Sequence, residues 1–260
     1  MPNHEVVMGL KGRHALVTGG GTGIGAAVAK QLAELGLHVS VLGRRRAPLD
    51  AFCEEVPHTA AFTADVADAA GVKRAFAAAA ETFGPISVLV NNAGMAVTSP
   101  FAEAELTDWQ RVLNVNLTGA FLCTREVLPA MRQEGWGRIV NIASTAGLKG
   151  YPFVVSYCAS KHGLIGMTRA LALEVARDGI TVNAVCPGYT ETELVEAALD
   201  NISVQSGRSR DSALGKLIAL NPQRRLVQPA EVANAVAWLC SPGATAITGQ
   251  SLAVAGGEVM

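Results

Sequence analysis

The sequence carries little charge of either sign, and this scarcity excludes several classes of partner. Only 17% of its 260 residues are charged, and the formal net charge is −1. Binding to nucleic acid or to an anionic membrane surface would favour a basic excess, which is missing here. Half of the residues are apolar, which is ample for a core covered on both faces. Chemistry on a small molecule is therefore the favoured class of function.

Cysteine patterns typical of disulfide frameworks and metal sites are also missing. The cysteines are an odd number and widely spread, with neither a CxxC pair nor a histidine at zinc spacing. We therefore predict no metal site and interpret most of them as small core residues. Cys158 lies beside Tyr157, but no histidine or aspartate accompanies it as a nucleophile requires. The five are Cys53, Cys123, Cys158, Cys186 and Cys240.

Long apolar runs are absent as well. No uninterrupted run approaches the roughly 18 residues that a membrane span requires. Residues 1–10 contain neither a basic leader region nor a sustained apolar stretch. We expect a soluble, cytoplasmic protein with no membrane partner and no nucleic-acid partner.

Strand and helix patterns alternate along the whole chain. No repeat, linker or low-complexity tract interrupts them, which is typical of a parallel, doubly wound α/β sheet. Chains of this size commonly fold as one domain. We predict a single Rossmann-type domain over residues 1–260 with helices on both faces of seven strands. The expected strands are 13–18, 38–42, 58–62, 86–90, 138–142, 181–186 and 247–254, and the expected helices are 24–35, 69–83, 105–131, one bearing Tyr157, and 229–239.

A glycine-rich turn follows the first strand and leads into an alanine-rich helix. Gly19, Gly23 and Gly25 have the spacing GxxxGxG. A strand, a glycine turn and a helix start together point backbone N–H groups at a phosphate, so we predict a dinucleotide site. The alternative is a tight turn without a ligand.

Three arginines follow the second strand. A site that prefers NAD usually has an acidic residue there for the ribose 2′-hydroxyl, whereas a 2′-phosphate favours arginine. Gly43 is followed by Arg44, Arg45 and Arg46, and guanidinium groups bind phosphate in a forked geometry. We expect NADP(H) as the preferred cofactor and NAD(H) as the second choice. A solvated basic turn is the alternative interpretation.

Polar residues also follow the third and fourth strands. Asp65 could accept a hydrogen bond from an adenine amino group, or it could cap the following helix. The turn Asn91-Asn92-Ala93-Gly94 could line the cofactor as well as stabilise the central sheet.

A serine, a tyrosine and a lysine have spacings that suit proton transfer. Tyr157 and Lys161 are four residues apart, so on a helix they share one face, with Cβ atoms roughly 5–6 Å apart. A nearby ammonium lowers the pKa of a phenol and makes it usable in acid and base chemistry. Ser144 follows a β-branched strand, where its hydroxyl could polarise the same carbonyl oxygen. Taken alone, such a tyrosine and lysine pair is also common on ordinary helices.

Residues 189–228 form the most irregular and most charged part of the chain. Loops beyond the carboxyl ends of parallel strands bind the ligands of such sheets. We therefore predict a substrate lid here, with a plain solvated face as the alternative. Its basic residues are Arg208, Arg210, Lys216, Arg224 and Arg225.

In combination these motifs resemble the short-chain dehydrogenase/reductase family over residues 10–257. The segment from Thr18 to Gly25 is similar to the family's TGxxxGIG cofactor loop, and the segment from Tyr157 to Lys161 is similar to its YxxxK motif. Each motif is weak alone, but five in the family's order along one chain are a strong signal. The other three are Asp65-Val66, Asn91-Asn92-Ala93-Gly94 and Pro187-Gly188.

The resemblance implies four catalytic residues, which are Asn116, Ser144, Tyr157 and Lys161. Tyr157 exchanges a proton with the substrate oxygen while hydride moves to or from the nicotinamide, and Ser144 holds that oxygen. Lys161 lowers the pKa of the tyrosine and grips the nicotinamide ribose. Asn116, rather than Asn114, matches the family's position and holds a water through which protons reach the lysine. Asparagine is mildly unfavourable inside a helix, which itself indicates a local role for this pair.

The turns and the resemblance together define a cofactor-binding set, in which Thr192 is implied to contact the nicotinamide amide. The resemblance also implies a homotetramer, assembled through the helices that bear Asn116 and Tyr157 and through the C-terminal segment. The expected cofactor-binding residues are Gly19, Thr22, Gly23, Ile24, Gly25, Arg44, Arg45, Asp65, Val66, Asn92, Ala93, Gly94, Tyr157, Lys161, Pro187, Gly188, Thr190 and Thr192.

Within the family, four stretches resemble bacterial ketoreductases that act on 3-oxoacyl thioesters, including polyketide ketoreductases: GRIVNIAST, SYCASKHG, GITVNAVCPG and QPAEVA. Two departures stand out. Ala255 replaces an aspartate that many relatives have, and the insert at residues 204–220 carries basic residues that could meet a phosphopantetheine or CoA phosphate.

We therefore expect an NADP(H)-dependent oxidoreductase of a small-molecule or acyl-thioester substrate, carried by CoA or an acyl carrier protein. One alternative is an NAD-dependent dehydrogenase of a free secondary alcohol, such as a sugar, a steroid or a cyclic alcohol. The other is a non-catalytic cofactor sensor, which the intact set of four residues disfavours.

Overall fold

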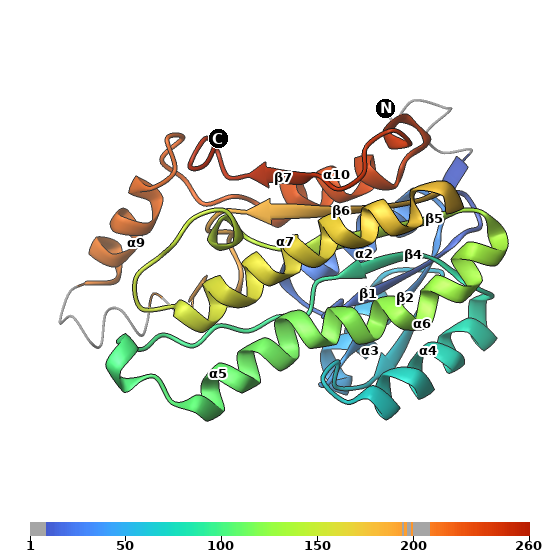
Figure 1. Ribbon diagram of the computed structural model, residues 1–260, viewed down its shortest axis with the longest axis horizontal. Helices are drawn as coiled ribbons and strands as arrows, with labels where there is room; N and C mark the ends of the chain where they lie inside the picture. The colour runs from blue at the N-terminus through green and yellow to red at the C-terminus, as the bar shows by residue number, and fades with distance from the viewer. Residues whose placement is uncertain (1–8, 194, 197–198, 200–208) are drawn as a thin grey trace.

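A computed structural model describes residues 9–193, 195–196, 199 and 209–260, which form a seven-stranded sheet between two layers of helices (Figure 1). The predicted doubly wound sheet is confirmed, and six strands begin and end within one residue of the expected positions. The strands are β1 His14–Thr18, β2 His38–Gly43, β3 Thr59–Thr63, β4 Ile86–Asn91, β5 Gly137–Ile142, β6 Ile180–Pro187 and β7 Ser251–Val254.

The strand order places one crevice at the centre of the sheet. The order is β3-β2-β1-β4-β5-β6-β7, and all neighbours pair in parallel. The chain builds outward from β1 to β3 and then crosses to the other side of β1, so the segments after β1 and β4 diverge. Sheets of this type bind ligands at such a switch point, outside the carboxyl ends of the strands.

Helices cover both faces of the sheet (Figure 1). One face carries α2 Gly23–Glu34, α3 Arg46–Glu55 and α10 Pro229–Cys240. The other carries α4 Ala69–Phe83, α6 Gly119–Glu134 and α7 Val155–Val175, with α5 Leu106–Leu113 packed on α7. The helix α9, Arg210–Ala219, lies beyond the carboxyl end of the sheet and forms a small core of its own with Val195 and Leu199. In the described part of the chain, no helix has the length and apolarity needed to cross a membrane.

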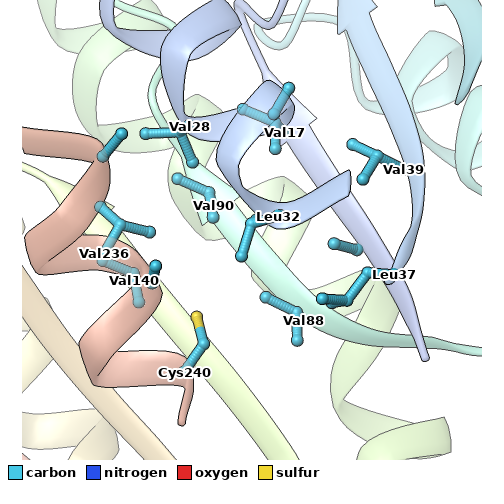
Figure 2. Close-up of a cluster of buried hydrophobic side chains, with 14 of the residues drawn as sticks. Val17, Val28, Leu32, Leu37, Val39, Val88, Val90, Val140, Val236 and Cys240 are labelled. Carbon is cyan, nitrogen blue, oxygen red and sulfur yellow. The ribbon is translucent and has the colours of Figure 1, made fainter. Parts of the chain in front are cut away.

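Alternate residues of each strand enter the two cores. In β1, Ala15 and Val17 pack on the α2 side, whereas Leu16 packs on the α4 side. This follows from the two-residue period of a strand that is buried on both faces. Figure 2 shows the α2 side, where valines from β1, β2, β4 and β5 surround Leu32 of α2 and Val236 of α10.

Three elements differ from the sequence expectations. The single helix expected over 105–131 is divided into α5 and α6 by a π-helical turn, Asn114–Thr118. The last strand begins at Ser251 rather than at 247, because Gly249 has a φ of 71° and extended structure cannot run through it. Arg46 is the first residue of α3 rather than part of a loop. Arg208 and the rest of 204–208, which belong to the predicted insert, lie outside the described residues.

Candidate active site

The glycine turn after β1 is shaped so that no side chain fits inside it. Gly19 has a φ of 64°, which favours glycine, and a Cβ on Gly25 would lie 2.1 Å from the Gly19 carbonyl oxygen. Thr22 precedes α2 but its side chain makes no capping hydrogen bond, and the first turn of α2 contains no acidic residue. The first N–H groups of α2 therefore lack a side-chain acceptor, and the positive end of the helix can receive an anion.

The Asn-Ala-Gly turn after β4 is bonded directly to the glycine turn. The Asn92 side chain donates to the carbonyls of Thr18, at 2.9 Å, and of Gly19, at 3.2 Å. In return, the Thr18 hydroxyl accepts from the backbone N–H groups of Asn92 and Ala93, each at 3.0 Å. The two turns are thus one rigid unit on either side of the crevice. Thr18 was not among the predicted site residues, although its place just before the glycine turn gave a signal.

The arginines after β2 differ in the partners they already have. Arg46 binds Asp50 at 2.7 and 2.8 Å within α3, so its guanidinium is committed. The Arg44 guanidinium lies 4.0 Å from the Asp65 carboxylate, and that of Arg45 lies 3.6 Å from Glu193. The side chain of Arg44 is 70% exposed and that of Arg45 is 68% exposed. Exposed pairs at these distances are weak, so a phosphate could displace them.

Asp65 does not cap the helix that follows it. Asp68 caps α4, accepting a hydrogen bond from the N–H of Ala70 at 3.1 Å, whereas Asp65 accepts from Ala67 at 2.9 Å. One oxygen of Asp65 faces Arg44. The capping alternative is therefore wrong, and the carboxylate stays at the edge of the crevice.

The segment after β6 closes the crevice from the other side. The Thr190 hydroxyl donates to the Gly188 carbonyl at 3.0 Å, and Thr190 bridges to Val227. A Cβ on Gly23 would lie 3.2 Å from the methyl carbon of Thr192. The predicted cofactor residues of four distant segments therefore meet in one place. Free helix N–H groups, close backbone approach and two available arginines fit a dinucleotide that carries an additional phosphate.

Ser144 and Tyr157 lie at the start of the elements that follow β5. Ser144 caps a short 3-10 turn, its hydroxyl accepting from Ala146 at 3.1 Å. Tyr157 is part-buried in the first turn of α7. Burial raises the pKa of the Tyr157 phenol, and the neighbouring Ser144 hydroxyl offsets part of that rise. The phenol therefore holds its proton at neutral pH.

Lys161 occupies the same face of α7, but its ammonium is turned towards β5. The Nζ atom donates to the Ile142 carbonyl at 2.7 Å and lies 5.6 Å from the centre of the Tyr157 ring. Burial lowers the pKa of Lys161 to about 8. Burial sets the direction of the Tyr157 pKa here, while the Lys161 ammonium is held by the Ile142 carbonyl. That Lys161 lowers the pKa of Tyr157 stays a prediction.

Asn116 lies in the π-helical turn and is buried, whereas Asn114 bonds to Gln110 on the exposed side. The Asn116 amide accepts from the Met95 N–H at 2.8 Å and donates to the Met95 carbonyl at 2.9 Å. It also donates to the Ser160 hydroxyl at 3.0 Å. Met95 and Ser160 thus occupy the Asn116 side-chain amide. The water that this residue was expected to hold for proton transfer to Lys161 would need to bind to atoms other than this amide. Ser160 was missed from sequence, although it lies inside the YxxxK motif.

Comparisons with known proteins agree with this geometry. A sequence model described as short chain dehydrogenase matches residues 13–202. The chain belongs to this family. A Streptomyces coelicolor protein provisionally named a ketoacyl reductase is 45% identical over 251 residues, covering 94% of this chain and 95% of that protein. D-beta-hydroxybutyrate dehydrogenase of Rhizobium meliloti is 35% identical, covering 94% of this chain and 97% of that protein.

A solved structure confirms the likeness in three dimensions. Actinorhodin polyketide ketoreductase, in a variant crystallised with NADPH, superposes with a TM-score of 0.91 at 43% identity, covering 95% of this chain and 97% of that one. The predicted family is therefore confirmed. This short chain dehydrogenase is an oxidoreductase that uses a nicotinamide cofactor.

Proposed function

We propose that this short chain dehydrogenase is an NADP(H)-dependent ketoreductase that interconverts a 3-oxoacyl and a 3-hydroxyacyl thioester of CoA or an acyl carrier protein. The observation that carries the proposal is the meeting of Ser144, Tyr157 and Lys161 beside a crevice rimmed by Arg44 and Arg45. The relatives named for ketoacyl and polyketide reduction support the substrate class.

In the proposed mechanism the side chains supply a proton and hold the reacting oxygen. Tyr157 keeps its proton at neutral pH because burial raises its pKa, so it can donate that proton to a ketone oxygen. Ser144 donates a hydrogen bond to the same oxygen and stabilises the developing charge. A nicotinamide cofactor, when bound, supplies the hydride for reduction and accepts it in oxidation. Lys161 and Asn116 would support the residues around Tyr157, since Lys161 donates to the Ile142 carbonyl and Asn116 donates to the Ser160 hydroxyl. Lys161 would also hold the nicotinamide ribose.

The remaining predicted residues would hold the cofactor. The glycine turn and the N-terminus of α2 would bind the pyrophosphate, and Arg44 and Arg45 the 2′-phosphate. Asp65 and Val66 would lie against the adenine. The Asn-Ala-Gly turn and the segment from Pro187 to Thr192 would line the nicotinamide side.

Residues 189–228 would act as the substrate lid of this single domain. Within the described residues, two of its arginines support the lid itself: Arg225 binds Glu231 at 2.6 Å through both nitrogens, and Arg210 pairs with Glu196. This leaves Lys216 and Arg224 as the candidates that could meet a carrier phosphate. Of the basic residues of the insert at 204–220, which were expected to meet such a phosphate, Lys216 therefore remains, and Arg208 lies outside the described residues.

A second candidate function is an NAD-dependent dehydrogenase of a free secondary alcohol. Two observations favour it. The relative from Rhizobium meliloti is named for a free hydroxy acid, and Asp65 lies 4.0 Å from Arg44, where it opposes a second anion.

Initial rates with both cofactors distinguish these functions. We would test acetoacetyl-CoA, a longer 3-oxoacyl thioester, a bicyclic ketone and simple ketones with NADPH and NADH, and the matching alcohols in reverse. A high NADPH rate confined to thioesters supports the proposal. Turnover only with NADH or NAD⁺ and free alcohols rejects both the thioester substrate and the role of Arg44.

The charge of Arg44 provides a separate test of cofactor preference. Arg44→Asp should weaken NADPH binding about tenfold or more, since one charge-assisted contact to phosphate is replaced by repulsion. NADH binding should change little. Arg46→Gln is the matched control, because that guanidinium is already bound to Asp50. An unchanged NADPH dissociation constant in Arg44→Asp, measured by fluorescence titration, contradicts the assignment.

We also propose that the protein forms a homotetramer through α6 and α7. Phe121 of α6 is 49% exposed and Leu173 of α7 is 84% exposed, which leaves apolar side chains on the predicted interface helices. Leu173→Glu should shift the mass measured by light scattering towards smaller species. A wild-type monomer contradicts the proposal.

A further inference from the structure

The C-terminal segment places a buried carboxylate beside the candidate active site. Glu258 is the only charged residue among the last ten, and its side chain is 1% exposed. The Tyr151 hydroxyl donates to one of its oxygens, and the Lys149 ammonium lies 3.2 Å from the same oxygen. Lys149 also donates to the Glu258 backbone carbonyl at 3.4 Å. The carboxylate is therefore held by two groups from one loop.

This loop leads directly back to Ser144. The Tyr151 and Thr145 hydroxyl oxygens are 2.7 Å apart. Since Tyr151 has one proton and gives it to Glu258, the Thr145 hydroxyl donates to the phenol. A line of hydrogen bonds thus runs from Thr145, the neighbour of Ser144, through Tyr151 to Glu258. Both burial and the carboxylate raise the pKa of Tyr151, so this donor stays protonated.

The same carboxylate also contacts the segment after β6. A Cβ on Gly188 would lie 3.0 Å from the second Glu258 oxygen, and the Gly188 N–H donates to the Val254 carbonyl at 3.1 Å. The rings of Tyr151 and Tyr189 meet edge to face, with centres 6.4 Å apart. Glu258 therefore touches both segments that flank the proposed reacting centre.

The chemistry of the cluster formed by Glu258, Tyr151 and Lys149 favours a role in positioning the loop over a role in stability alone. A buried ion pair is often no more stabilising than apolar residues of the same volume. The loop from Thr145 to Val154 contains one short 3-10 turn, and Phe153 has a left-handed φ of 66°. Local structure alone leaves such a loop weakly determined. A directional hydrogen bond to a buried charge defines its position more sharply than an apolar contact does.

We propose that Glu258 is a positioning residue, which fixes the loop between Ser144 and Tyr157 by holding Tyr151 and Lys149. This role rests on the proposed ketoreductase function. Glu258 contacts no reacting atom, so its loss should reduce kcat and leave cofactor binding nearly unchanged. The C-terminal residues thereby become part of the catalytic geometry.

Kinetics of four variants and one control variant test the proposal. Glu258→Ala and Tyr151→Phe should each lower kcat about tenfold to a hundredfold, the range expected when a reacting group is misplaced by about 1 Å. The double variant should be no worse than the worse single variant, because both changes break one line of bonds. Glu258→Gln keeps an acceptor for Tyr151 and should recover most of the rate. Glu55→Gln is the matched control, since Lys30 and Glu55 are also 3.2 Å apart but lie 52% and 72% exposed.

Alkylation of Cys158 gives a second measurement that needs no turnover. Its sulfur lies 4.0 Å from the Tyr151 carbonyl, so it reports the order of the loop at that point. Glu258→Ala should raise the iodoacetamide rate of Cys158 several-fold, read by peptide mass spectrometry. Cys53, which is also part-exposed, is the internal control and should not change.

The outcomes separate this proposal from the function on which it rests. If the wild type reduces no ketone, the ketoreductase function fails, and Cys158 alkylation still decides whether Glu258 orders the loop. If the wild type is active but Glu258→Ala keeps kcat within twofold, the positioning role is rejected. Losses that multiply in the double variant, or an equal loss of cofactor affinity, also overturn it.

Discussion

Burial acts in opposite directions on two residues of α7 that lie one turn apart. It raises the pKa of Tyr157, whose neutral form it favours, and it lowers the pKa of Lys161 to about 8, because it penalises the ammonium. The tyrosine thus retains its proton while the lysine retains its charge only below that pH. This combination suits an acid that protonates a ketone oxygen.

Removal of the phenolic oxygen should abolish most turnover. Tyr157→Phe keeps the ring and its packing but loses the proton donor, so kcat should fall by about 10²- to 10⁴-fold. Cofactor affinity should stay within about twofold, because the ring remains in place. Stopped-flow kinetics and fluorescence titration measure the two quantities. A variant that turns over at near wild-type rate contradicts the mechanism.

Lys161→Met should separate stability from activity. The fall of the Lys161 pKa from its ordinary 10.5 to about 8 corresponds to about 3 kcal/mol of unfavourable charge burial at neutral pH. Since the folded pKa is the lower one, stability should rise with pH between about 8 and 10.5 and stay low below that window. The variant, which we expect to be inactive, should therefore be as stable as the wild type or more stable at pH 7.

Urea unfolding of both proteins at pH 7 and pH 9 tests this prediction. The difference in unfolding free energy between them isolates Lys161, because the raised pKa values of Cys123 and Cys240, each about 12, affect both proteins alike. A wild type that is more stable than Lys161→Met by the same amount at both pH values contradicts the prediction.

Residue types and spacings led to a prediction of the site's chemistry, but they could not give its contacts. Tyr157 and Lys161 share a face of α7, as their spacing requires. The direction of the Lys161 ammonium depends on the Ile142 carbonyl, 19 residues away. Glu258 meets Tyr151 across 107 positions of sequence. No local pattern encodes contacts of that separation, because only the sheet brings their segments together.

Among the elements, strands were easier to predict than helices. Buried strands between turns have sharp ends in sequence, and β4 ends at Asn91, one residue beyond the expectation. The apolar residues over 105–131 recur at helical spacing. That spacing does not reveal a π-helical turn of five residues within the helix. That turn carries Asn116 into contact with Met95 and Ser160.

The glycine turn and the start of α2 should not tolerate a single added methyl group. In Gly25→Ala the Cβ would lie 2.1 Å from the Gly19 carbonyl oxygen and 2.5 Å from the Asn92 amide nitrogen. Both contacts belong to the rigid unit that joins β1 to β4, so neither can yield easily. We expect a loss of about 1–3 kcal/mol in unfolding free energy and a large loss of cofactor affinity.

Gly215→Ala is the matched control for this substitution. Gly215 lies inside α9, and a Cβ there would meet no atom within 4 Å. Alanine should stabilise that helix by about 0.4–1 kcal/mol and leave cofactor affinity unchanged. Thermal unfolding and titration with NADPH compare the two variants. Equal unfolding temperatures and equal NADPH affinities for Gly25→Ala and Gly215→Ala would show that the glycine turn is less constrained than its geometry indicates.

At the scale of the whole molecule, the parallel sheet gives the protein two ends with different side chains. The carboxyl ends of the strands hold the candidate active site. The amino ends hold a histidine cluster, in which His14 and His38 both pack on Phe83, with ring centres 5.5 and 5.0 Å away. The alternation of strands and helices predicted the doubly wound sheet. Residues 189–228, with little regular pattern in sequence, could be predicted only as irregular, and the helix α9 within them was missed.

His14 should make the folded protein sensitive to mild acid. Its ring nitrogens bond to the Gly84 carbonyl at 2.7 Å and the Ser40 hydroxyl at 2.8 Å, and burial, with His38 nearby, lowers its pKa. Because the folded pKa is below the ordinary 6.5, the unfolded chain takes up the proton first as pH falls. The contribution of His14 to stability is therefore complete above about pH 6.5 and is lost as the pH falls below that value. The total loss in unfolding free energy is about 1.4 kcal/mol for each pH unit that separates the folded pKa from the unfolded one.

Comparison of His14→Gln with the wild type tests this origin of acid sensitivity. The variant should be less stable at pH 7.5, since it loses the fit to Gly84 and Ser40, but it should lose less stability than the wild type between pH 7.5 and 5.5. The exposed His162→Gln is the control and should keep the wild-type slope. Urea midpoints at both pH values supply the measurement. Because this window lies above the range in which carboxylates titrate, an equal slope in His14→Gln and the wild type would show that the histidine end of the sheet does not govern acid stability.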